Sequence, residues 1–271
     1  MRMVVNVLLQ LKQIHKVFNE GTPDEKVALQ QMNLHLKPGD FMTVIGSNGA
    51  GKSTLMNLIS GKMIPDLGQV VIDNHDVTFV KEHKRAKLIG RVFQDPMAGT
   101  APAMTIEENL AIAFSRTTSR SLKKGVTKDK RNFFQEMLET LHLGLENRLQ
   151  AKVGLLSGGE RQALSLLMAT FTEPKILLLD EHTAALDPSR AELVTELTKE
   201  IVATYKLTTL MVTHNMQQAL DLGNRLMMMD KGQLIFEANE EQKKNLTVDQ
   251  LLLEFQRIRG EKMNSDKAVL I

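Results

Sequence analysis

The sequence predicts an α/β fold built around a mostly parallel sheet, and two observations carry this prediction. Short apolar runs at 176–179, 208–212 and 225–229 are separated by stretches of helical spacing, which is the β-α-β pattern of a parallel sheet. The run Phe41–Ile45 adds a buried strand, followed by the glycine-rich stretch GSNGAGKST at 46–54 and then by a helical segment. The order of strand, loop and helix places this loop at the carboxyl end of its strand.

The first part of the chain is predicted to be rich in strands, and a block of helices follows it. Predicted strands are Val7–Phe18, Leu34–Leu36, Val70–Ile72, Val77–Phe79 and Leu88–Phe93. From Met104 the spacing becomes helical, first in TIEENLAIAF and then in RNFFQEMLETLHL, and Thr105 with Glu108 predicts a capping box. Between these helices we expect a polar, basic loop. A helical block therefore interrupts the α/β core.

The composition is that of an ordinary globular protein. Of 271 residues 42% are apolar, and 34 basic against 32 acidic side chains give a formal charge of +2, so nothing in the charge balance favours nucleic acid as a partner. Cysteine is absent, which excludes disulfides and thiolate metal sites. No apolar run approaches the ~18 residues of a membrane span, and the N-terminus lacks the cleavage site of a signal peptide. We expect a soluble chain whose membrane role, if it has one, comes through a partner.

The stretch at 46–54 matches the phosphate-binding loop pattern, a glycine, four residues and then Gly-Lys-Ser/Thr. Glycines let the backbone wrap closely around phosphate oxygens, and the helix beginning at Lys52 adds its positive N-terminal end. Lys52 is predicted to reach the β- and γ-phosphates, and the Ser53 hydroxyl to ligate Mg²⁺. The alternative is a glycine-rich turn that only precedes a helix. The predicted nucleotide-binding residues of this loop are Gly46, Ser47, Asn48, Gly49, Ala50, Gly51, Lys52, Ser53 and Thr54.

Two acids follow the predicted strand at 176–179. Because the carboxyl end of a parallel strand faces the crevice where ligands bind, Asp180 is predicted to hold Mg²⁺ through water beside Ser53. Glu181 is placed to polarise the water that attacks the γ-phosphate. The alternative is a pair of capping or surface acids after a core strand.

Further motifs in a fixed order make the chain resemble the ATP-binding cassette (ABC) ATPases over roughly residues 5–237. The sequence LLSGGERQ resembles the family signature LSGGQ, with Glu160 in place of glutamine, and Ser157 is predicted to cap a helix over Gly158–Thr170. In the family, the signature of one subunit closes on the ATP held by another. The resemblance therefore implies a head-to-tail pair of chains with Ser157, Gly158, Gly159 and Glu160 on the partner's nucleotide.

The resemblance gives roles to several other residues. Gln94 matches the family's glutamine loop, which touches the metal and the attacking water and hinges the helical subdomain. His214 matches the histidine that bridges the γ-phosphate and Glu181. Phe18 stands where the family stacks an aromatic ring on adenine, although it could equally be a core residue. Ala184–Asp187 matches the loop that communicates across the dimer, and His182 replaces a common proline.

The fold implied by the resemblance is a P-loop NTPase of the ABC type. It has an N-terminal antiparallel β subdomain, a mostly parallel core sheet and an inserted α-helical subdomain. We expect a nucleotide-binding domain over 1–240 with its helical subdomain at about 96–156, and a helical tail over 241–271. Because a phosphate loop alone would accept GTP, the assignment of ATP with Mg²⁺ rests on the resemblance. The residues implied in catalysis are Glu181, His214, Gln94 and Lys52, and those in metal binding are Ser53, Gln94 and Asp180.

Three classes of function compete for a cassette of this kind: a transporter subunit, a soluble cassette acting on ribosomes or nucleic acid, and a mechanical or regulatory ATPase at the membrane. The chain has a single set of motifs, and the segment from Ser53 to Ser157 is too short for a coiled coil, so the transporter class is favoured. The sequence of Gly90–Leu110 resembles that of bacterial amino-acid uptake cassettes of the tryptophan/tyrosine or branched-chain type.

An importer of this type implies a second copy of the chain, a transmembrane permease that sits between the glutamine loop and the helical block, and an extracytoplasmic solute-binding protein. The chain would then be peripheral at the cytoplasmic face of the cell membrane. An exporter subunit is the alternative. For the basic stretch Arg116–Arg131, a solvated loop and attraction to anionic lipid headgroups both stay open.

Overall fold

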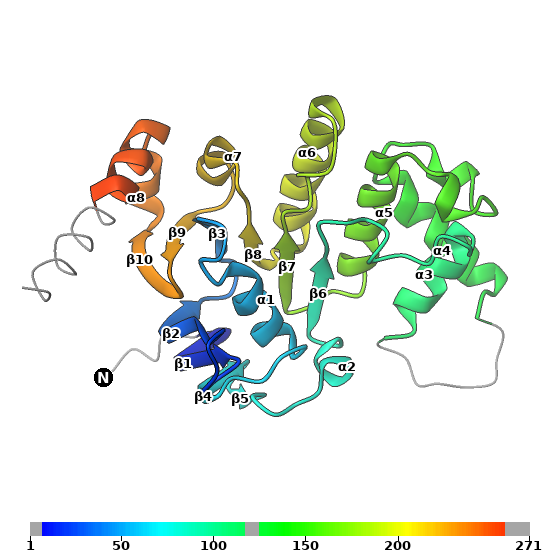
Figure 1. The fold of residues 1–271 in the computed structure, drawn as a ribbon. Coiled ribbons are helices and arrows are strands. Elements are labelled where there is room, and N and C mark those ends of the chain that lie inside the picture. Colours follow the sequence, from blue (N-terminus) through cyan, green and yellow to red (C-terminus); the bar gives the residue numbers. More distant parts are fainter. Residues whose placement is uncertain (1–6, 117–124, 258–271) are drawn as a thin grey trace, which may run out of the picture.

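The computed structural model describes residues 7–116 and 125–257, and its centre is a mostly parallel sheet of six strands within these residues (Figure 1). The strand order is β10-β9-β3-β8-β7-β6, with β10 antiparallel to β9 and the other pairs parallel. The strands are β3 (Phe41–Gly46), β6 (Ile89–Val92), β7 (Ile176–Asp180), β8 (Thr208–Val212), β9 (Arg225–Asp230) and β10 (Gln233–Ala238). The predicted fold class is confirmed.

A second, antiparallel sheet from the N-terminal part of the chain has the order β2-β1-β4-β5. Its strands are β1 (Leu9–Phe18), β2 (Lys26–Leu36), β4 (Leu67–Ile72) and β5 (His75–Asp76). The strand predicted at Val77–Phe79 is wrong. Asp73 and Asn74 both have positive φ and form a tight hairpin, after which β5 pairs with β4 over His75 and Asp76. The N–H of Val77 still donates to Val70, but the N–H of Val70 donates to the Thr78 hydroxyl and not to a backbone carbonyl, so the strand ends here. The carboxylate of Asp76 then accepts from the backbone N–H of Thr78 at 2.9 Å and turns the chain out of the sheet.

Both faces of the six-stranded sheet are buried, and the alternation along β7 shows how. Ile176 and Leu178 belong to the core shared with the antiparallel sheet and with α1 (Lys52–Ser60). Leu177 and Leu179 belong to the core on the opposite face, shared with the helical block. Because side chains alternate along a strand, Asp180 continues on the face of α1, where the phosphate loop lies.

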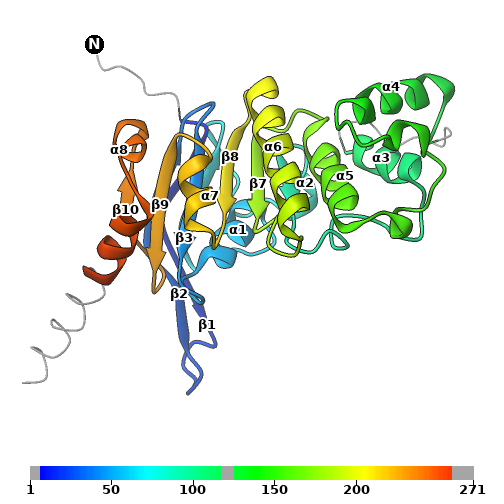
Figure 2. The same ribbon diagram turned by 90° about the horizontal axis from the view of Figure 1, so that it is seen from above.

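The remaining helices flank this sheet, and those of the helical block lie together at one end of the molecule (Figure 2). They are α2 (Glu82–Arg85), α3 (Ile106–Phe114), α4 (Lys128–Glu139), α5 (Gly158–Thr170), α6 (Pro188–Tyr205), α7 (Met216–Asp221) and α8 (Glu240–Lys244). The capping box of Thr105 and Glu108 is confirmed at the start of α3. A cluster of four aromatic rings joins α3 and α4 to the end of α5; its members are Phe114, Phe133, Phe134 and Phe171. The proposed limits of the helical subdomain and of the tail stay predictions.

The basic stretch between α3 and α4 lies partly outside the described residues, at 117–124. In its described part α4 begins at Lys128, so residues 128–131 of the stretch are helical. The Arg131 guanidinium pairs with Glu107 at 2.7 Å, and the Lys130 ammonium lies 5.6 Å from the centre of the Phe114 ring. These charges therefore hold α4 against α3.

The C-terminal part of the described chain packs on the outer edge of the sheet through α8 and a helix over 248–257. The Lys243 side chain is buried, and its Nζ donates to the carbonyl oxygens of Leu222 and Gly223 just after α7. Burial lowers the pKa of Lys243 to about 8, against the opposing attraction of Asp221. Lys243 thus fastens α8 to the end of α7. None of the helices in residues 7–116 and 125–257 is long and apolar enough to cross a membrane.

We expect the stability of the protein to rise with pH between about 8 and 10.5 because of Lys243. In this range the unfolded chain still binds a proton at Lys243 that the folded chain has released, so the free energy of unfolding increases by up to ~3 kcal/mol over the interval. Urea unfolding of the nucleotide-free protein at pH 7.5, 8.5 and 9.5 measures this. Lys243→Met should have a flatter profile, whereas Lys244→Met, which changes a neighbouring exposed lysine, should keep the slope of the unmodified protein. Equal slopes for all three proteins would contradict the assignment.

Candidate nucleotide-binding site

The candidate site lies where the carboxyl ends of three neighbouring parallel strands meet. Gly46 ends β3, Asp180 ends β7, and Thr213 with His214 follows β8. Ligands of open α/β sheets bind at such strand ends. Backbone bonds fix these ends to one another, since the N–H of Thr213 donates to Val44 at 3.1 Å and the N–H of Glu181 donates to Val212 at 3.0 Å. Residues far apart in sequence thereby reach one place.

The loop at 46–54 has a backbone that only glycine allows at two of its positions. Gly51 has φ +99°, and a Cβ atom there would lie 2.4 Å from the carbonyl oxygen of Ala28. At Gly46 a Cβ atom would lie 2.3 Å from the carbonyl oxygen of Met229. Gly51 also occupies the N-cap of α1, and no side chain caps this helix. The amide groups of its first turn therefore remain available for an anion, and the helix dipole favours one.

The Lys52 side chain extends across the inside of the loop, from the start of α1 to the end of β3. It is buried, and its Nζ donates to the carbonyl oxygens of Gly46 at 2.8 Å and Ser47 at 3.0 Å. Burial lowers the pKa of Lys52, while the nearby carboxylates of Glu181 and Asp180 act in the opposite direction. An ammonium group held on neutral carbonyls in this way can turn to phosphate oxygens when they enter, because a bond to an anionic oxygen is stronger than one to a neutral carbonyl.

Glu181 and His214 form a close pair beside Lys52. The His214 Nε2 lies 2.6 Å from the Glu181 Oε1, and the glutamate side chain is 14% exposed. Glu181 has φ +47°, a left-handed conformation that is rare for a residue with a side chain. In this conformation the carboxylate contacts His214 at the wall of the cavity that Lys52 also lines.

Most of the predicted nucleotide-binding residues line one open cavity of about 200 Å³. Its walls are Phe18, Lys26, Ala28, Asn48, Gly49, Ala50, Gly51, Lys52, Ser53, Thr54, Glu181 and His214. Phe18 is therefore at a cavity wall rather than in any of the three apolar cores. Lys26 and Ala28 were missed by the sequence analysis. They belong to β2, which no local motif connects with the phosphate loop. Ser47 lies at the neighbouring cavity behind the loop, where its hydroxyl meets Asp230 at 2.9 Å.

The oxygen donors near this cavity fit a magnesium ion. Mg²⁺ takes one or two protein oxygens and completes its shell with phosphate and water. Within the described residues no group of three acids, histidines or cysteines converges on a point, as a site built from protein alone would require. The carboxylate of Asp180 and the hydroxyl of the exposed Ser53 are suitable as these one or two protein oxygens. Gln94 follows β6 as an exposed residue and does not line the cavity.

The predicted signature residues lie elsewhere, at the start of α5. Ser157 caps the helix, and Glu160 completes a capping box by accepting from the N–H of Ser157 at 2.7 Å. Arg148 pairs with the other carboxylate oxygen of Glu160 at 2.6 Å. Burial alone would raise the pKa of Glu160, but its bonds with Ser157 and Arg148 outweigh burial and lower that pKa. Its charge is thus neutralised within the same chain.

We expect Glu160→Gln, which installs the residue usual in the signature, to leave hydrolysis within about twofold of the unmodified protein. Glutamine can form the same capping box, and the surface ion pair lost with Arg148 contributes only about 0–1 kcal/mol. Steady-state hydrolysis assays and thermal unfolding check this expectation. Ser157→Ala is the informative comparison, because it removes the cap itself, which costs about 1 kcal/mol of stability. A loss of hydrolysis in Glu160→Gln of more than tenfold would show that the carboxylate acts directly on nucleotide.

The turn that follows Glu181 packs back onto the signature of the same chain. His182 is fully buried with its Nε2 3.0 Å from the Thr198 hydroxyl of α6, and burial lowers its pKa to about 4. A neutral imidazole therefore fills the place where the family commonly has proline. Asp187 caps α6 by accepting from the N–H of Arg190 at 3.2 Å, and the Arg190 side chain lies against Gly159. The strand acids and the signature are thus joined through the start of α6.

A phosphate loop, a strand ending in two acids and a separate glycine-rich helix start define a nucleotide-hydrolysing cassette. The family model for the ABC transporter matches residues 29–184. The chain therefore belongs to the ABC transporter family, as its motifs indicated, and it is an ATP-binding subunit with ATPase activity.

Curated relatives and solved structures agree with this assignment. The chain is 43% identical to the tyrosine transport ATP-binding protein of Clostridioides difficile (strain R20291), over 92% of this chain and 99% of that protein. It is 33% identical to the methionine import ATP-binding protein MetN 1 of Staphylococcus aureus (strain MSSA476), over 84% of this chain but only 64% of that longer protein.

Among solved structures, the ADP conformation of the ATP-binding cassette MJ1267 matches with a TM-score of 0.76 and 30% identity, over 92% of this chain and 97% of that one. The dimeric, post-hydrolysis structure of the cassette MJ0796 bound to ADP and Pi matches with a TM-score of 0.73 and 28% identity, over 86% and 99%.

Proposed function

We propose that the protein is the ATPase subunit of an amino-acid importer, in which two copies close on two ATP molecules beneath a permease. The main observation behind this proposal is that the phosphate loop, Glu181 and His214 line the same cavity. The amino-acid class is supported by the names of the relatives, one a tyrosine transport ATP-binding protein and others methionine import ATP-binding proteins. Tyrosine or a similar amino acid is the first substrate to test.

The roles proposed for the site combine its geometry with the resemblance to the family. Phe18 would stack on the adenine, and the loop amides and Lys52 would hold the phosphates. Ser53 with Asp180 and Gln94 would hold Mg²⁺, whose charge would offset that of the phosphates. Glu181 accepts a proton from the attacking water, and its 2.6 Å contact with His214 keeps the carboxylate oriented toward the γ-phosphate position. Gln94 reaches the site only if its loop moves inward, because it lies outside the cavity in this structure.

Dimerisation explains why the signature lies away from the phosphate loop of its own chain. α5 is a helix of 13 residues, and Ser157 with the amides that follow it forms a second helix N-terminus that can bind an anion. In a head-to-tail pair each such terminus completes the nucleotide site of the other copy. Leu155, which is 75% exposed next to Ser157, would become covered in that pair. The related cassette MJ0796 has been solved as a dimer, which supports this arrangement.

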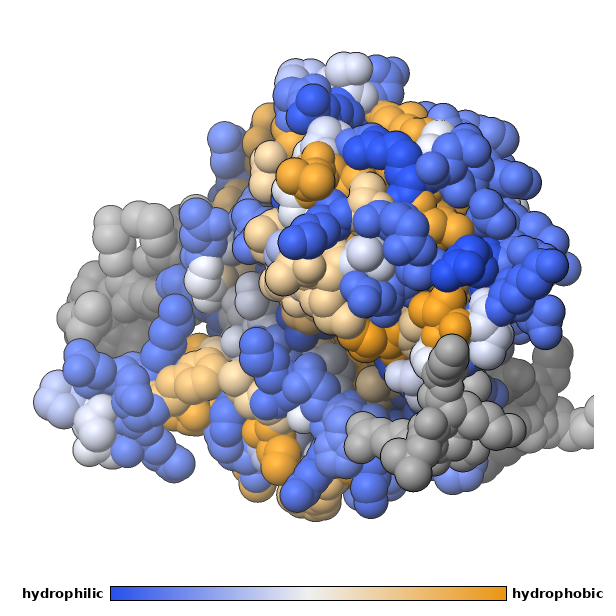
Figure 3. All heavy atoms as spheres, turned by 90° about the vertical axis from the view of Figure 1, so that its right-hand side faces the viewer, coloured by the Kyte–Doolittle hydropathy of each residue, from blue (hydrophilic) through white to orange (hydrophobic). Residues whose placement is uncertain are grey.

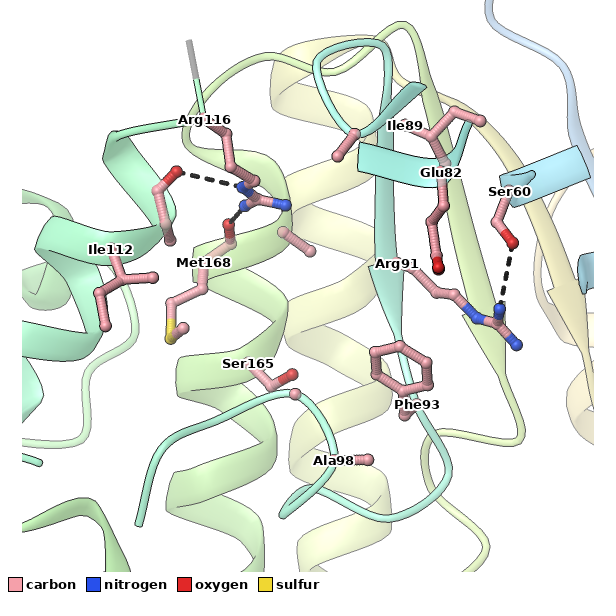
Figure 4. Close-up of a pocket in the computed structure, with 14 residues that line it drawn as sticks. Ser60, Glu82, Ile89, Arg91, Phe93, Ala98, Ile112, Arg116, Ser165 and Met168 are labelled. Atoms are coloured by element: carbon pink, nitrogen blue, oxygen red, sulfur yellow. Dashed lines mark hydrogen bonds between the residues drawn. The ribbon is translucent and has the colours of Figure 1, made fainter. Parts of the chain in front are cut away.

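A groove between the helical block and β6 is the proposed seat of the permease (Figure 4). It has a volume of about 280 Å³ and an apolar wall from α3 and α5, where Ile112 is 52% exposed and Met168 lies beside it. The opposite wall carries Arg91 and Phe93 of β6 and the loop after it, with Glu82 of α2. Hydrophilic residues cover most of this end of the molecule, and apolar surface is exposed between them (Figure 3). A short amphipathic segment fits a half-apolar groove of this kind.

Affinity purification tests this function. Tagged Glu181→Gln protein, loaded with ATP, is purified from gently solubilised native membranes, and co-purifying proteins are identified by mass spectrometry. We expect a permease whose gene lies beside that of a solute-binding protein. The matched control carries Ile112→Glu in addition, which places a charge in the groove and should abolish permease recovery while ATP binding persists. A permease without a solute-binding protein would indicate an exporter, and recovery of ribosomal proteins alone would exclude transport.

A further inference from the structure

Arg91 connects the metal-binding acid of the candidate site with the groove. One end of its guanidinium, NH2, donates to the Oδ2 of Asp180 at 3.0 Å. The other, NH1, donates to the Asn57 amide oxygen at 2.9 Å and to the Ser60 hydroxyl at 3.3 Å, both on α1. The arginine side chain is only 11% exposed and that of Asp180 17%, so this is a largely buried ion pair.

The sheet register explains why these residues meet. Arg91 of β6 lies opposite Leu178 of β7, and both side chains point to the face of α1. Asp180 is two residues beyond Leu178 and follows the same face. A buried carboxylate without a partner is strongly unfavourable, whereas a rigid guanidinium fork satisfies its charge and fixes its orientation. The bond from Arg91 therefore orients the carboxylate of Asp180.

We propose that Arg91 is a positioning residue for Mg²⁺ binding, acting through Asp180. Arg91 occupies Oδ2, and Oδ1 has no hydrogen-bond partner among the described residues, so Oδ1 is the oxygen that would be available to the metal site. This inference rests on the proposed role of Asp180. Partners that orient a metal ligand in this manner contribute 10–100-fold to metal affinity.

The same arginine belongs to the wall of the groove. Its guanidinium carbon lies 4.8 Å from the centre of the Phe93 ring, and both side chains line the cavity (Figure 4). The Nε of Arg91 is buried without a hydrogen-bond partner in the described part of the chain, so only the two terminal nitrogens of the guanidinium hold it in place. A segment seated in this groove would therefore contact the arginine that holds Asp180.

A titration with Mg²⁺ tests the inference on the full chain. Binding of a fluorescent ATP analogue is followed as Mg²⁺ is added, and the Mg²⁺ concentration at half-effect is compared between variants. We expect Arg91→Met to raise this concentration about tenfold or more, and Arg91→Lys to restore part of the loss because it keeps one charged donor. Arg225→Met is the matched control: Arg225 is 12% exposed, is paired with Asp40 and lies outside the site, so its variant should titrate like the unmodified protein.

Two further variants keep the outcomes separable. If Arg91→Met does not fold, Asn57→Ala removes one anchor of the guanidinium and keeps its charge, and we expect a rise of about threefold. An unchanged titration in Arg91→Met, or in Asn57→Ala where that variant replaces it, would overturn the inference. Asp180→Asn tests the proposed function itself: if it leaves the titration unchanged, the metal role of Asp180 fails, whereas a rise in Asp180→Asn alone overturns only the role of Arg91.

Discussion

Glu181→Gln is expected to reduce ATP hydrolysis by about 10²–10⁴-fold while ATP binding persists. The amide cannot take the proton from the attacking water, and a positioned general base contributes a factor of this size. The substitution keeps the shape of the side chain and a hydrogen-bonding atom for His214, so the cavity is preserved. With bound ATP no longer consumed, the closed pair of cassettes should accumulate. Single-turnover hydrolysis and light scattering during gel filtration measure the two effects.

Glu200→Gln is a matched control for this variant, because it makes the same change at an exposed position of α6. It should hydrolyse ATP normally and show no stable dimer. A Glu181→Gln protein that turns over at the normal rate and stays monomeric with ATP would remove Glu181 from the reaction.

Lys52→Met is expected to weaken ATP binding by about 100-fold or more. The ammonium is the only buried cation among the residues that line the described cavity, and a charge-assisted bond in such a site is worth about 1.5–3 kcal/mol before any long-range attraction. The variant also loses both bonds to the carbonyls of Gly46 and Ser47, so the loop becomes less ordered. Calorimetric titration with a non-hydrolysable ATP analogue measures the affinity.

Lys26→Met and Lys62→Met provide the comparison for Lys52. Lys26 is an exposed residue of the same cavity and should cost at most a few-fold in affinity, because solvent screens its charge. Lys62 is exposed beyond the end of α1 and should have no effect. Equal losses in the Lys26 and Lys52 variants would mean that general electrostatic attraction, rather than a placed ammonium, binds the phosphates.

Much of this fold is local in origin and was therefore predictable. The capping box at Thr105 and the helix over Gly158–Thr170 follow from residues three or four positions apart, and both appear where the sequence predicts them. The error at Val77–Phe79 has a local cause as well: an apolar run was given more weight than the turn from Asp76 to Thr78, in which the Thr78 hydroxyl takes the place of a backbone acceptor for Val70.

The unpredicted features depend on tertiary structure. Lys26 enters the cavity because β2 crosses beside the phosphate loop, and Arg91 meets Asp180 because β6 and β7 are neighbours in the sheet although 89 positions separate the two residues. The neutralisation of Glu160 by Arg148 was not predictable either. The motif predicted the residue type and the start of the helix, whereas the partner that orients the Glu160 side chain is known only from the structure.

Uptake of labelled amino acids by the native cells tests the central proposal most directly. A strain lacking this gene is complemented with either the unmodified protein or Lys52→Met, and initial uptake rates are measured for tyrosine, methionine and the remaining amino acids. We predict that uptake of one amino acid or one related group falls to background without the gene, is restored by the unmodified protein and is not restored by Lys52→Met. Unchanged uptake of every amino acid, or higher accumulation in the strain that lacks the gene, would contradict an importer.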